Sequence, residues 1–590
     1  MSKKFLCTTG LEESWDLNAQ SYILLGEYYE SILRKKLSQN SEIIALDYLW
    51  KDEENIDKGI SFCKNTYEKT IEYLTKILNQ YHGVNKDILY WKRLMGSWLY
   101  LYIMAIYDRY SHLKLAYSKF DDLFTNTMDT KAYSFIGTSD DYFKLICTND
   151  YYNLQLYSQI INYLNLRNKI IDVKPNFVIS GIRINQSKFS IKSTLKKIVY
   201  FIVARGSSFL NSLFSKNSVL VVQPYFKSDF FKKLLKLTWK SKFLFIFDNF
   251  QYKVSIDANP SLEQRKKLFG IKKFDNEFEN LLFDTMVYNF PMIFLEAYHK
   301  FNSSVKRLNI KKIDALYSAN ALKNSEIFRF YASENMDNIK IIYSQHGGNY
   351  GIDKISINEF LEIDFSDFYF TYGWTNDEGK RIRPISQPPI LSSNKSSNDI
   401  VLIMNYFSKY FYIFHYLEDA GKSIKYIENT KNFLLNFKYI DSVTIRPYMI
   451  DDGWNFKQRL LDTGLKLKFD NSTSYYKQIA ESRLNIFDHM HTGFMESLSI
   501  NKPTIVFIAD VYAFRDDAKD YINLLIDANI LFLNAERCAI FLNKIYDSVE
   551  KWWDSDAVQK ARMMFLDRYF KTSDNWVDEW VAEFNGILEK

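Results

Sequence analysis

Short apolar runs rich in β-branched and aromatic residues recur along much of the chain and predict buried strands. Before residue 390 we predict strands at 5–9, 43–49, 218–222, 243–247, 315–318, 341–343 and 368–371. After it we predict strands at 400–404, 443–445, 484–487 and 504–508. Segments with a helical pattern separate most of these runs, and such alternation is typical of α/β folds with parallel sheets.

Two long stretches have a helical pattern of apolar residues instead. Between residues 55 and 117 apolar and aromatic residues recur at spacings of three and four, with Trp91, Leu94 and Trp98 in one stripe. Residues 138–216 are again mostly helical in pattern. We therefore expect a large helical insertion at about 55–216.

A change of composition at residues 383–398 predicts the boundary between two domains. This segment holds Pro384, Pro388 and Pro389, a third of the chain's nine prolines, followed by a polar Ser- and Asn-rich run. We predict domains at 1–390 and 391–590. The expected fold class is α/β, with two Rossmann-like domains facing a cleft and the helical insertion in the N-terminal one.

The composition excludes several classes of protein. Hydrophobic residues make up 47% of the 590 and charged residues 25%, which argues against disorder. The net charge of +6 is too small to indicate nucleic-acid binding. Four widely spaced cysteines without a CxxC pair argue against a zinc site or disulfide framework and fit a reducing cytosol. No signal peptide or membrane-spanning segment is predicted, and we expect a cytoplasmic protein.

Residues 341–351 combine an apolar strand with a polar, glycine-rich turn. Gln345, His346, Gly347 and Gly348 follow the strand directly. Glycines allow the backbone to approach a ligand closely, and a histidine at this place suits a general base or a phosphate contact. Glu359, Glu362 and Asp364 come later in the chain, and we expect a carboxylate among them to lie near His346.

A second polar turn, at residues 488–498, precedes a predicted helix. His491, Thr492 and Gly493 lie at its start, where free N–H groups and the helix dipole favour phosphate. Glu496, one turn later, suits ribose hydroxyls. No cysteine or third histidine accompanies His489 and His491, so we expect no metal site.

Other strand ends supply further candidates for the cleft. Arg446 and Asn405 follow strands of the C-terminal domain, and an arginine there can grip a phosphate. Arg515 follows the strand at 504–508. Thr9, Glu12 and Glu13 follow the first strand, and we expect them to face the cleft from the N-terminal domain, on the side opposite these residues. Glu12, Glu13 and His346 are all candidates for the catalytic base, and the sequence does not choose among them.

The segment Thr-Gly-Phe-Met-Glu-Ser-Leu-Ser-Ile-Asn-Lys-Pro-Thr-Ile, at residues 492–505, is similar to the donor-nucleotide helix of GT-B glycosyltransferases. Five other motifs resemble a family of transferases from bacterial surface-polysaccharide gene clusters. They are Cys-Thr-Thr-Gly-Leu-Glu-Glu-Ser-Trp at 7–15, Trp-Lys-Arg-Leu-Met-Gly-Ser-Trp-Leu at 91–99 with Tyr-Asp-Arg-Tyr at 107–110, Gln-His-Gly-Gly-Asn-Tyr-Gly at 345–351, Phe-Arg-Asp-Asp-Ala-Lys-Asp-Tyr at 514–521 and Trp-Trp at 552–553. The resemblance covers nearly the whole chain.

The resemblance implies a glycosyltransferase that passes a sugar from a nucleotide donor to a surface-glycan acceptor. Residues 1–390 would then bind the acceptor and residues 391–590 the donor. The nucleotide sugar is a co-substrate, so no cofactor is expected, and without an Asp-x-Asp motif after a strand we expect metal-independent transfer. A lipid-linked acceptor would bring the protein to the cytoplasmic face of the inner membrane. Basic clusters such as Arg34-Lys35-Lys36 suit an anionic surface.

The nucleotide of the donor stays open. GT-B sialyl- and Kdo-transferases contact CMP through a His-Pro dipeptide after a C-domain strand, and here Arg446-Pro447 stands in that place. A CMP-activated ulosonic acid such as Kdo or a sialic-acid-like sugar is one candidate, and UDP- and GDP-sugars are others.

Three further functions fit parts of the sequence. A polyol-phosphate transferase of the CDP-glycerol type would share the phosphate site, and the mass of its product would distinguish it. A non-catalytic glycan-binding or assembly protein would bind nucleotide without turnover. A sugar epimerase with two Rossmann-like lobes ranks below transfer because of the helical insertion.

Overall fold

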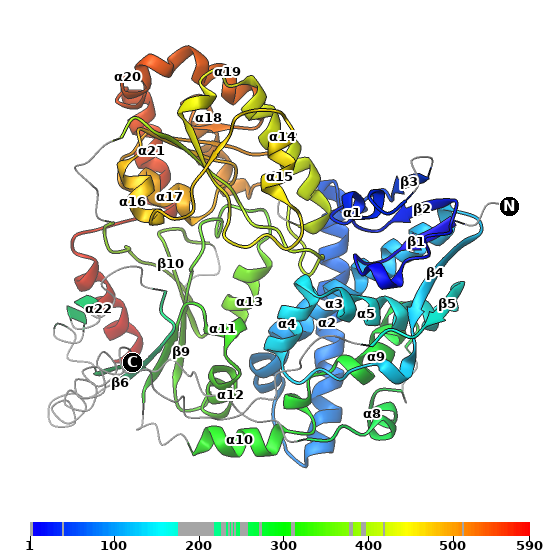
Figure 1. The fold of residues 1–590 in the computed structure, drawn as a ribbon. Coiled ribbons are helices and arrows are strands. Elements are labelled where there is room, and N and C mark those ends of the chain that lie inside the picture. The colour runs from blue at the N-terminus through cyan, green and yellow to red at the C-terminus, as the bar shows by residue number, and fades with distance from the viewer. Residues whose placement is uncertain are drawn as a thin grey trace, which may run out of the picture.

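A computed structural model describes most of the chain as three parallel β-sheets with helices around them (Figure 1). The described residues are 4–37, 41–174, 218–225, 232–233, 236–237, 240, 244–247, 258–270, 274–307, 313–376, 381–390, 397–416, 419–509 and 512–589. Every pairing between named strands is parallel.

The C-terminal sheet has the strand order β14-β13-β12-β15-β16-β17, which is the Rossmann order. Its strands are β12 (Ile400–Ile403), β13 (Val443–Arg446), β14 (Lys468–Phe469), β15 (Leu484–Phe487), β16 (Thr504–Phe507) and β17 (Leu531–Phe532). The accompanying helices are α14 (Ser423–Asn436), α15 (Phe456–Leu461), α16 (Tyr475–Glu481), α17 (Thr492–Ser499), α18 (Lys519–Asp527), α19 (Ala535–Ile545), α20 (Val549–Trp553) and α21 (Asp556–Tyr569). The order reverses between β12 and β15, and ligands of such sheets bind beyond the strand ends at that reversal.

The middle sheet has the order β11-β10-β9-β8-β6-β7, with its reversal between β6 and β8. Its strands are β6 (Ser218–Val222), β7 (Leu244–Phe247), β8 (Ala315–Ser318), β9 (Lys340–Ser344), β10 (Phe368–Thr371) and β11 (Ile382–Pro384). Its helices are α10 (Tyr298–Lys306), α11 (Ala321–Asn324), α12 (Glu326–Glu334) and α13 (Ile357–Phe365).

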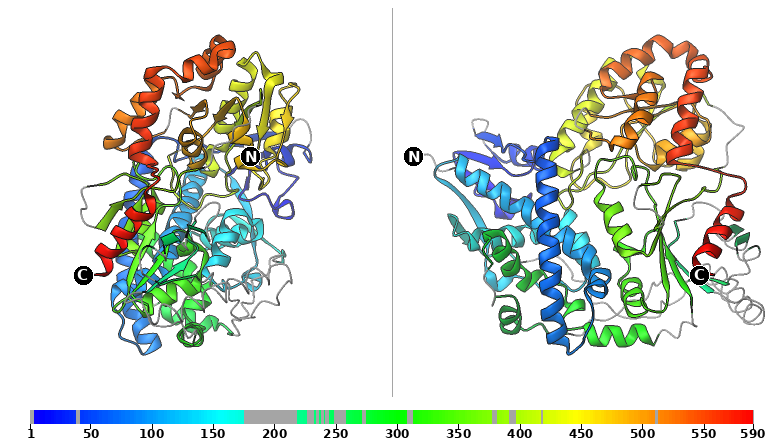
Figure 2. Two further views of the ribbon diagram at one scale, coloured as in Figure 1. Left: turned by 90° about the vertical axis from the view of Figure 1, so that its left-hand side faces the viewer. Right: turned by 180° about the vertical axis from the view of Figure 1, so that it is seen from behind.

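The helix α22 (Trp576–Leu588) also belongs to the middle sheet, although it follows the whole C-terminal domain in the chain. Trp580 and Phe584 of α22 pack against Tyr317 and Phe370 of the sheet. Figures 1 and 2 show α22 beside the middle sheet, so the chain passes from this sheet into the C-terminal domain and back.

The first sheet has the order β3-β2-β1-β4-β5, again Rossmann-like. Its strands are β1 (Lys4–Cys7), β2 (Ser21–Leu24), β3 (Glu42–Ala45), β4 (Leu123–Met128) and β5 (Asn168–Ile171). The helices on this side of the molecule are α1 (Glu30–Arg34), α2 (Glu53–His82), α3 (Ile88–Lys119), α4 (Ser139–Thr148), α5 (Asp150–Tyr163), α8 (Leu262–Phe269) and α9 (Glu277–Asn289).

Helix α3 is the buried centre of the molecule. Asp87 begins it, because its side chain accepts a hydrogen bond from the Tyr90 N–H. The predicted stripe of Trp91, Leu94 and Trp98 is fully buried. Arg93 joins the helix to the middle domain, since its guanidinium donates to the Phe365 carbonyl at 3.0 Å. One hydrophobic core therefore runs from α2 and α3 into the middle sheet.

The predicted fold class is confirmed, because the middle and C-terminal sheets form two Rossmann-like α/β units. The first sheet is not expected from the sequence as a separate unit. Strands β4 and β5 lie inside the expected helical insertion, and β11 lies where a linker is expected. Pro384 is tolerated there because β11 is at the edge of its sheet. Residues 175–216 of that insertion lie outside the described residues, and the domain boundary at 390 stays a prediction.

No described helix has an apolar stretch long enough to span a lipid bilayer.

Candidate functional site

The turn after β9 is held in place by Gln345. This buried side chain donates from Nε2 to the Gly347 carbonyl at 2.7 Å. Its oxygen accepts the Trp374 indole N–H at 2.8 Å and the Tyr372 N–H at 3.0 Å. With both ends of the amide occupied, Gln345 orients the turn and leaves ligand contact to its neighbours.

His346 and Glu362 lie side by side at this turn. Nδ1 of His346 lies 3.3 Å from Oε1 of Glu362, and the imidazole side chain is 25% exposed whereas the carboxylate is buried. Glu362 also accepts the hydroxyls of Tyr350 and Tyr369, both at 2.9 Å. With Glu362 beside Nδ1, Nε2 across the ring is the imidazole atom that could act on a substrate.

Gly348 brings the turn against the C-terminal domain. A Cβ atom at this position would lie under 3.0 Å from the carbonyl carbon of His491 and the nitrogen of Thr492. Both atoms belong to backbone at the start of α17, which cannot move aside. Only glycine permits this approach, and it places the His346 turn beside the helix N-terminus.

The start of α17 has the features of an anion site. His491 is the N-cap residue, and its side chain makes no capping hydrogen bond. The first N–H groups of a helix carry partial positive charge and bind phosphate. The hydroxyl of Tyr475 is shielded from solvent beside Gly493 and has no hydrogen-bond partner among the described residues.

Glu496 lies one turn into α17, buried and surrounded by tyrosines. Burial, and then the charge of Glu496, raise the pKa values of Tyr225, Tyr475 and Tyr476. The ring of Tyr225 also stands edge-on to His346, with centroids 5.7 Å apart. Tyr225 therefore lies near both Glu496 of the C-terminal domain and His346 of the middle domain.

Asn405 and Arg446 lie at the ends of β12 and β13, on the same edge as α17. The Asn405 N–H donates to Tyr426, while its buried side-chain Nδ2 has no partner among the described residues. Arg446 donates to the Thr473 carbonyl at 2.8 Å and stacks over Tyr475. Arg446 thus holds the α16 wall of the site as well as adding positive charge to it.

Glu359 and Arg515 meet in an ion pair between the two domains. Their side chains are 2.9 Å apart, and the backbone of Arg515 donates to the Ile352 carbonyl at 2.9 Å. Burial raises the pKa of Glu359 to about 7 despite this arginine. The pair therefore links the middle domain to the C-terminal domain.

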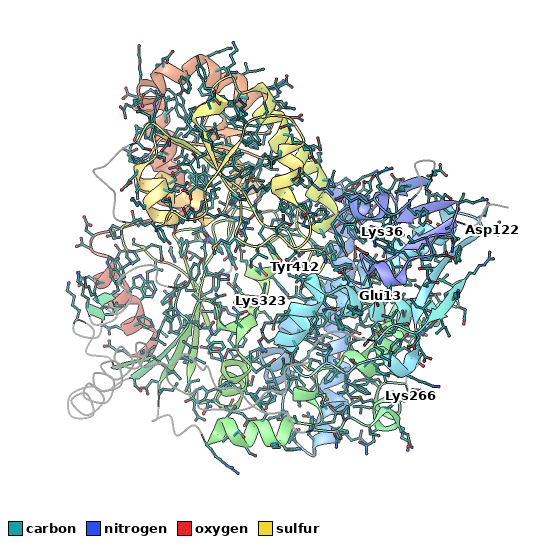
Figure 3. The ribbon with its side chains drawn as sticks, viewed as in Figure 1. Glu13, Lys36, Asp122, Lys266, Lys323 and Tyr412 are labelled. Carbon is teal, nitrogen blue, oxygen red and sulfur yellow. The ribbon has the colours of Figure 1, made fainter. Side chains whose placement is uncertain are left out.

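Thr9, Glu12 and Glu13 belong to the first sheet. Thr9 is buried, and its carbonyl accepts the Trp15 indole N–H at 2.9 Å. Glu12 pairs with Lys36, and Glu13 lies 3.4 Å from the Tyr151 hydroxyl. Glu13 lies among the elements of the first sheet (Figure 3). These contacts join the three residues to the first sheet and its helices, and the choice among Glu12, Glu13 and His346 as catalytic base stays a prediction.

Sequence reasoning missed Tyr225 and Tyr475. Tyr225 follows β6 in a turn where Gln223 and Tyr225 have φ values of 42° and 55°. Such left-handed backbone at a non-glycine residue is uncommon and clusters at functional sites. The signal in the sequence was the Gln-Pro-Tyr run directly after a predicted strand.

Among the described residues no group of three or more His, Cys, Asp or Glu side chains is arranged to hold a metal ion. Metal-independent transfer stays a prediction.

The buried Glu362 makes stability depend on pH. Burial raises its pKa from 4.5 to about 8. Between these values the unfolded chain has released the proton and the folded chain retains it, so stability falls as pH rises. We expect the free energy of unfolding to fall by up to about 1.4 kcal/mol per pH unit across this window from this group. Denaturant unfolding of wild type and Glu362→Gln from pH 5 to 8 measures it.

The Glu362→Gln variant should show a flatter pH dependence, and the exposed Glu54→Gln should keep the wild-type slope. Equal slopes in all three proteins would show that Glu362 ionises normally in the folded state.

The family described as LIC12162 family transferase matches residues 4–584. No curated protein matches the chain.

Solved structures share low similarity with it. A Thermobaculum terrenum O-GlcNAc transferase mutant is 8% identical over 90% of this chain and 98% of its own, with a TM-score of 0.35. The UDP-forming α,α-trehalose-phosphate synthase of Burkholderia vietnamiensis is 8% identical over 63% of this chain and 97% of its own, with a TM-score of 0.35. A TarM mutant of S. aureus, in complex with fondaparinux, α-GlcNAc-glycerol and UDP, is 14% identical over 46% of this chain and 55% of its own, with a TM-score of 0.29.

Proposed function

We propose that this chain, which belongs to the LIC12162 family of transferases, transfers a sugar from a nucleotide donor to the hydroxyl of a glycan acceptor. The observation that carries the proposal is the contact between Gly348 and the start of α17. It brings His346, which lies beside the buried Glu362, from one Rossmann-like sheet to the N-terminus of a helix of another.

The donor nucleotide would occupy the C-terminal side. Its phosphates would lie at the N-terminus of α17, at Thr492 and Gly493, where the helix dipole stabilises negative charge. Glu496 would accept hydrogen bonds from the ribose hydroxyls. Asn405, whose side-chain Nδ2 has no partner in the described part of the chain, lies at the strand end where the Rossmann order reverses, the usual ligand position of such sheets.

The reaction would form one bond and break one. The acceptor oxygen attacks the anomeric carbon of the sugar, and the bond from that carbon to the phosphate oxygen breaks. Nε2 of His346 accepts the acceptor's proton, while Glu362 beside Nδ1 helps to position the ring. The start of α17 meets the charge that develops on the departing phosphate.

The finer assignments rest on the resemblance of the sequence motifs. We propose a surface glycan as acceptor, a metal-independent reaction and a donor drawn from CMP-, UDP- or GDP-sugars. CMP-dependent GT-B enzymes have a His-Pro dipeptide where this chain has Arg446-Pro447. A CMP-linked ulosonic acid is therefore tested beside UDP- and GDP-sugars. We also propose a peripheral position at the cytoplasmic face of the inner membrane, where a lipid-linked acceptor would lie; Arg34 and Lys36 of the basic cluster are exposed and pair with Glu30 and Glu12.

A thermal-shift panel with CMP, CDP, UDP, GDP and their sugar conjugates tests the donor site. A ligand at one hundred times its dissociation constant should raise the free energy of unfolding by about 2.7 kcal/mol. We expect one nucleotide to do so, and Glu496→Ala to weaken its binding at least tenfold because the ribose loses its hydrogen-bond acceptor.

Glu550→Ala, which changes an exposed glutamate paired with Arg483, is the matched control and should bind like wild type. Absence of a shift with every nucleotide would contradict the proposal. A shift accompanied by a product heavier by a polyol phosphate would assign the site to the CDP-glycerol type instead.

A further inference from the structure

Lys323 is a charged side chain at the carboxyl edge of the middle sheet that the proposed reaction does not use. It belongs to α11, which follows β8, the strand next to β9 and its His346 turn. The backbone of α11 is fixed there, because the Leu322 N–H donates to the Tyr343 hydroxyl at 3.1 Å. Figure 3 shows Lys323 and Tyr412, which lies in the loop after β12, in the region where the middle and C-terminal domains meet. Lys323 therefore lies at the edge where such sheets bind ligands.

The ammonium of Lys323 lies close to Glu362, the neighbour of His346. It donates a hydrogen bond to the side-chain oxygen of Asn358 on α13. Asn358 and Glu362 are four residues apart on that helix, so they share one face, with their Cβ atoms about 5–6 Å apart. Oε1 of Glu362 in turn lies 3.3 Å from Nδ1 of His346. The ammonium therefore lies about one helical turn from the carboxyl group beside His346.

Within the described part of the chain, Lys323 has no acidic partner. The side chain is half-buried, its hydrogen bond goes to a neutral amide, and no described carboxylate oxygen lies within 4 Å of its ammonium. Burial lowers the pKa of Lys323, whereas the nearby Glu362 and Cys147 raise it. Burial also raises the pKa of Glu362 to about 8 and that of Cys147 to about 12, so both stay mainly protonated at pH 7. A lysine withdrawn from water usually has an anionic partner, which here a substrate would supply.

The place of Lys323 in the fold favours the acceptor as the substrate that supplies this charge. The phosphates of the donor have their own proposed site at the start of α17, in the C-terminal domain. Lys323 belongs instead to the middle domain, as does His346, whose Nε2 would act on the acceptor hydroxyl. Its helix α11 also packs against α4, on the side of the first sheet. An anionic group at Lys323 would therefore belong to the glycan that receives the sugar.

We propose that the acceptor carries an anionic group, a carboxylate or a phosphate, and that Lys323 binds this group beside the hydroxyl that is attacked. The inference rests on the proposed function and deepens it by naming the class of acceptor, an acidic or phosphorylated glycan. The ammonium holds the charged group while the neighbouring hydroxyl lies at Nε2 of His346. A neutral glycan leaves the ammonium without a counter-charge and binds more weakly.

Binding of defined oligosaccharides in the absence of any donor tests the class of acceptor. An array of neutral, uronic-acid-containing and phosphorylated oligosaccharides is screened, and calorimetry gives the dissociation constants of the strongest charged binder and its neutral counterpart. We expect wild type to prefer the charged compound at least tenfold, and its identity distinguishes a carboxylate from a phosphate. Lys323→Met puts an unbranched apolar side chain in place of the ammonium. It should abolish the preference and leave the affinity for the neutral compound unchanged.

Two further variants separate the charge of Lys323 from its packing and from the net charge of the protein. Lys323→Arg keeps a positive charge and should retain most of the preference. Lys300→Met removes an exposed lysine on α10 and should bind like wild type.

Nucleotide thermal shifts on the same variants separate this inference from the proposed donor site. They should match wild type, because Lys323 is assigned to the acceptor. Nucleotide binding without any preference for charged oligosaccharides would overturn the inference and leave the donor site standing, whereas the absence of every nucleotide shift would contradict the proposed function. The inference is also overturned if no oligosaccharide binds, if Lys323→Met keeps the preference, or if Lys323→Met weakens nucleotide binding, since the ammonium would then belong to the donor site.

Discussion

Replacing His346 by alanine is expected to lower the rate of sugar transfer by about 10²–10⁴-fold, the usual contribution of a positioned acid or base. The acceptor hydroxyl then has no group to take its proton. Donor binding should stay within twofold of wild type, because the proposed nucleotide contacts lie on α17. Steady-state transfer assays and nucleotide thermal shifts on the same preparation measure both quantities.

His299→Ala serves as the matched control, since this histidine is exposed on α10, and it should leave transfer unchanged. Added imidazole should restore part of the rate of His346→Ala by replacing the lost base. An unchanged rate in His346→Ala would remove the residue from the mechanism and return Glu12 and Glu13 to consideration.

The substitution Gly348→Val should have an effect of similar size for a different reason. Any side chain at this position meets backbone atoms of His491 and Thr492, so the turn and α17 must separate. A displacement of about 1 Å between reacting groups can cost 10²-fold in rate. We expect a loss of at least this size with an unchanged far-ultraviolet circular dichroism spectrum, and weaker donor binding as α17 shifts.

Gly586→Ala is the matched control, because a Cβ atom there meets no other atom within 4 Å. It should retain full activity. If Gly348→Val were fully active, the two domains would have to work at a larger separation than the one described, and the close approach of Gly348 to α17 would no longer support sugar transfer.

The turn at His346 and the start of α17 could be predicted because both follow strong patterns. Each is a polar, glycine-containing run directly after a buried apolar strand, and in parallel sheets such positions lie at the ligand-binding edge. Local sequence therefore places His346, Thr492, Gly493 and Glu496 on the right kind of loop. The contact between Gly348 and α17 is tertiary and has no local signal.

The first sheet shows where pattern reasoning stops. Strand β4 carries Thr and Asn at positions that are buried, and β5 begins with Asn and Lys. Such polar strands lack a clear apolar pattern, and the long helices α2 and α3 obscure them. Sequence reasoning puts Glu13 beside His346 at the bond-forming centre, because it assigns both residues to one N-terminal domain, whereas β1 and β9 belong to different sheets.

Arg515 and Glu359 illustrate a different limit. Both are predicted at the cleft from their positions along the chain, and both do lie between the domains. The two side chains form an ion pair with each other, and a sequence cannot show which charged side chains pair across a domain boundary.

The return of the chain to the middle sheet through α22 also has a consequence during synthesis on the ribosome. Trp576, Trp580 and Phe584 cover apolar residues of β6, β8 and β10, yet they emerge only after the entire C-terminal domain. At about 5–20 residues per second, that face of the nascent sheet would wait roughly 10–40 s for its cover. The middle domain would thus finish folding after the C-terminal domain that follows it in the chain. We expect a chaperone to act on its uncovered face.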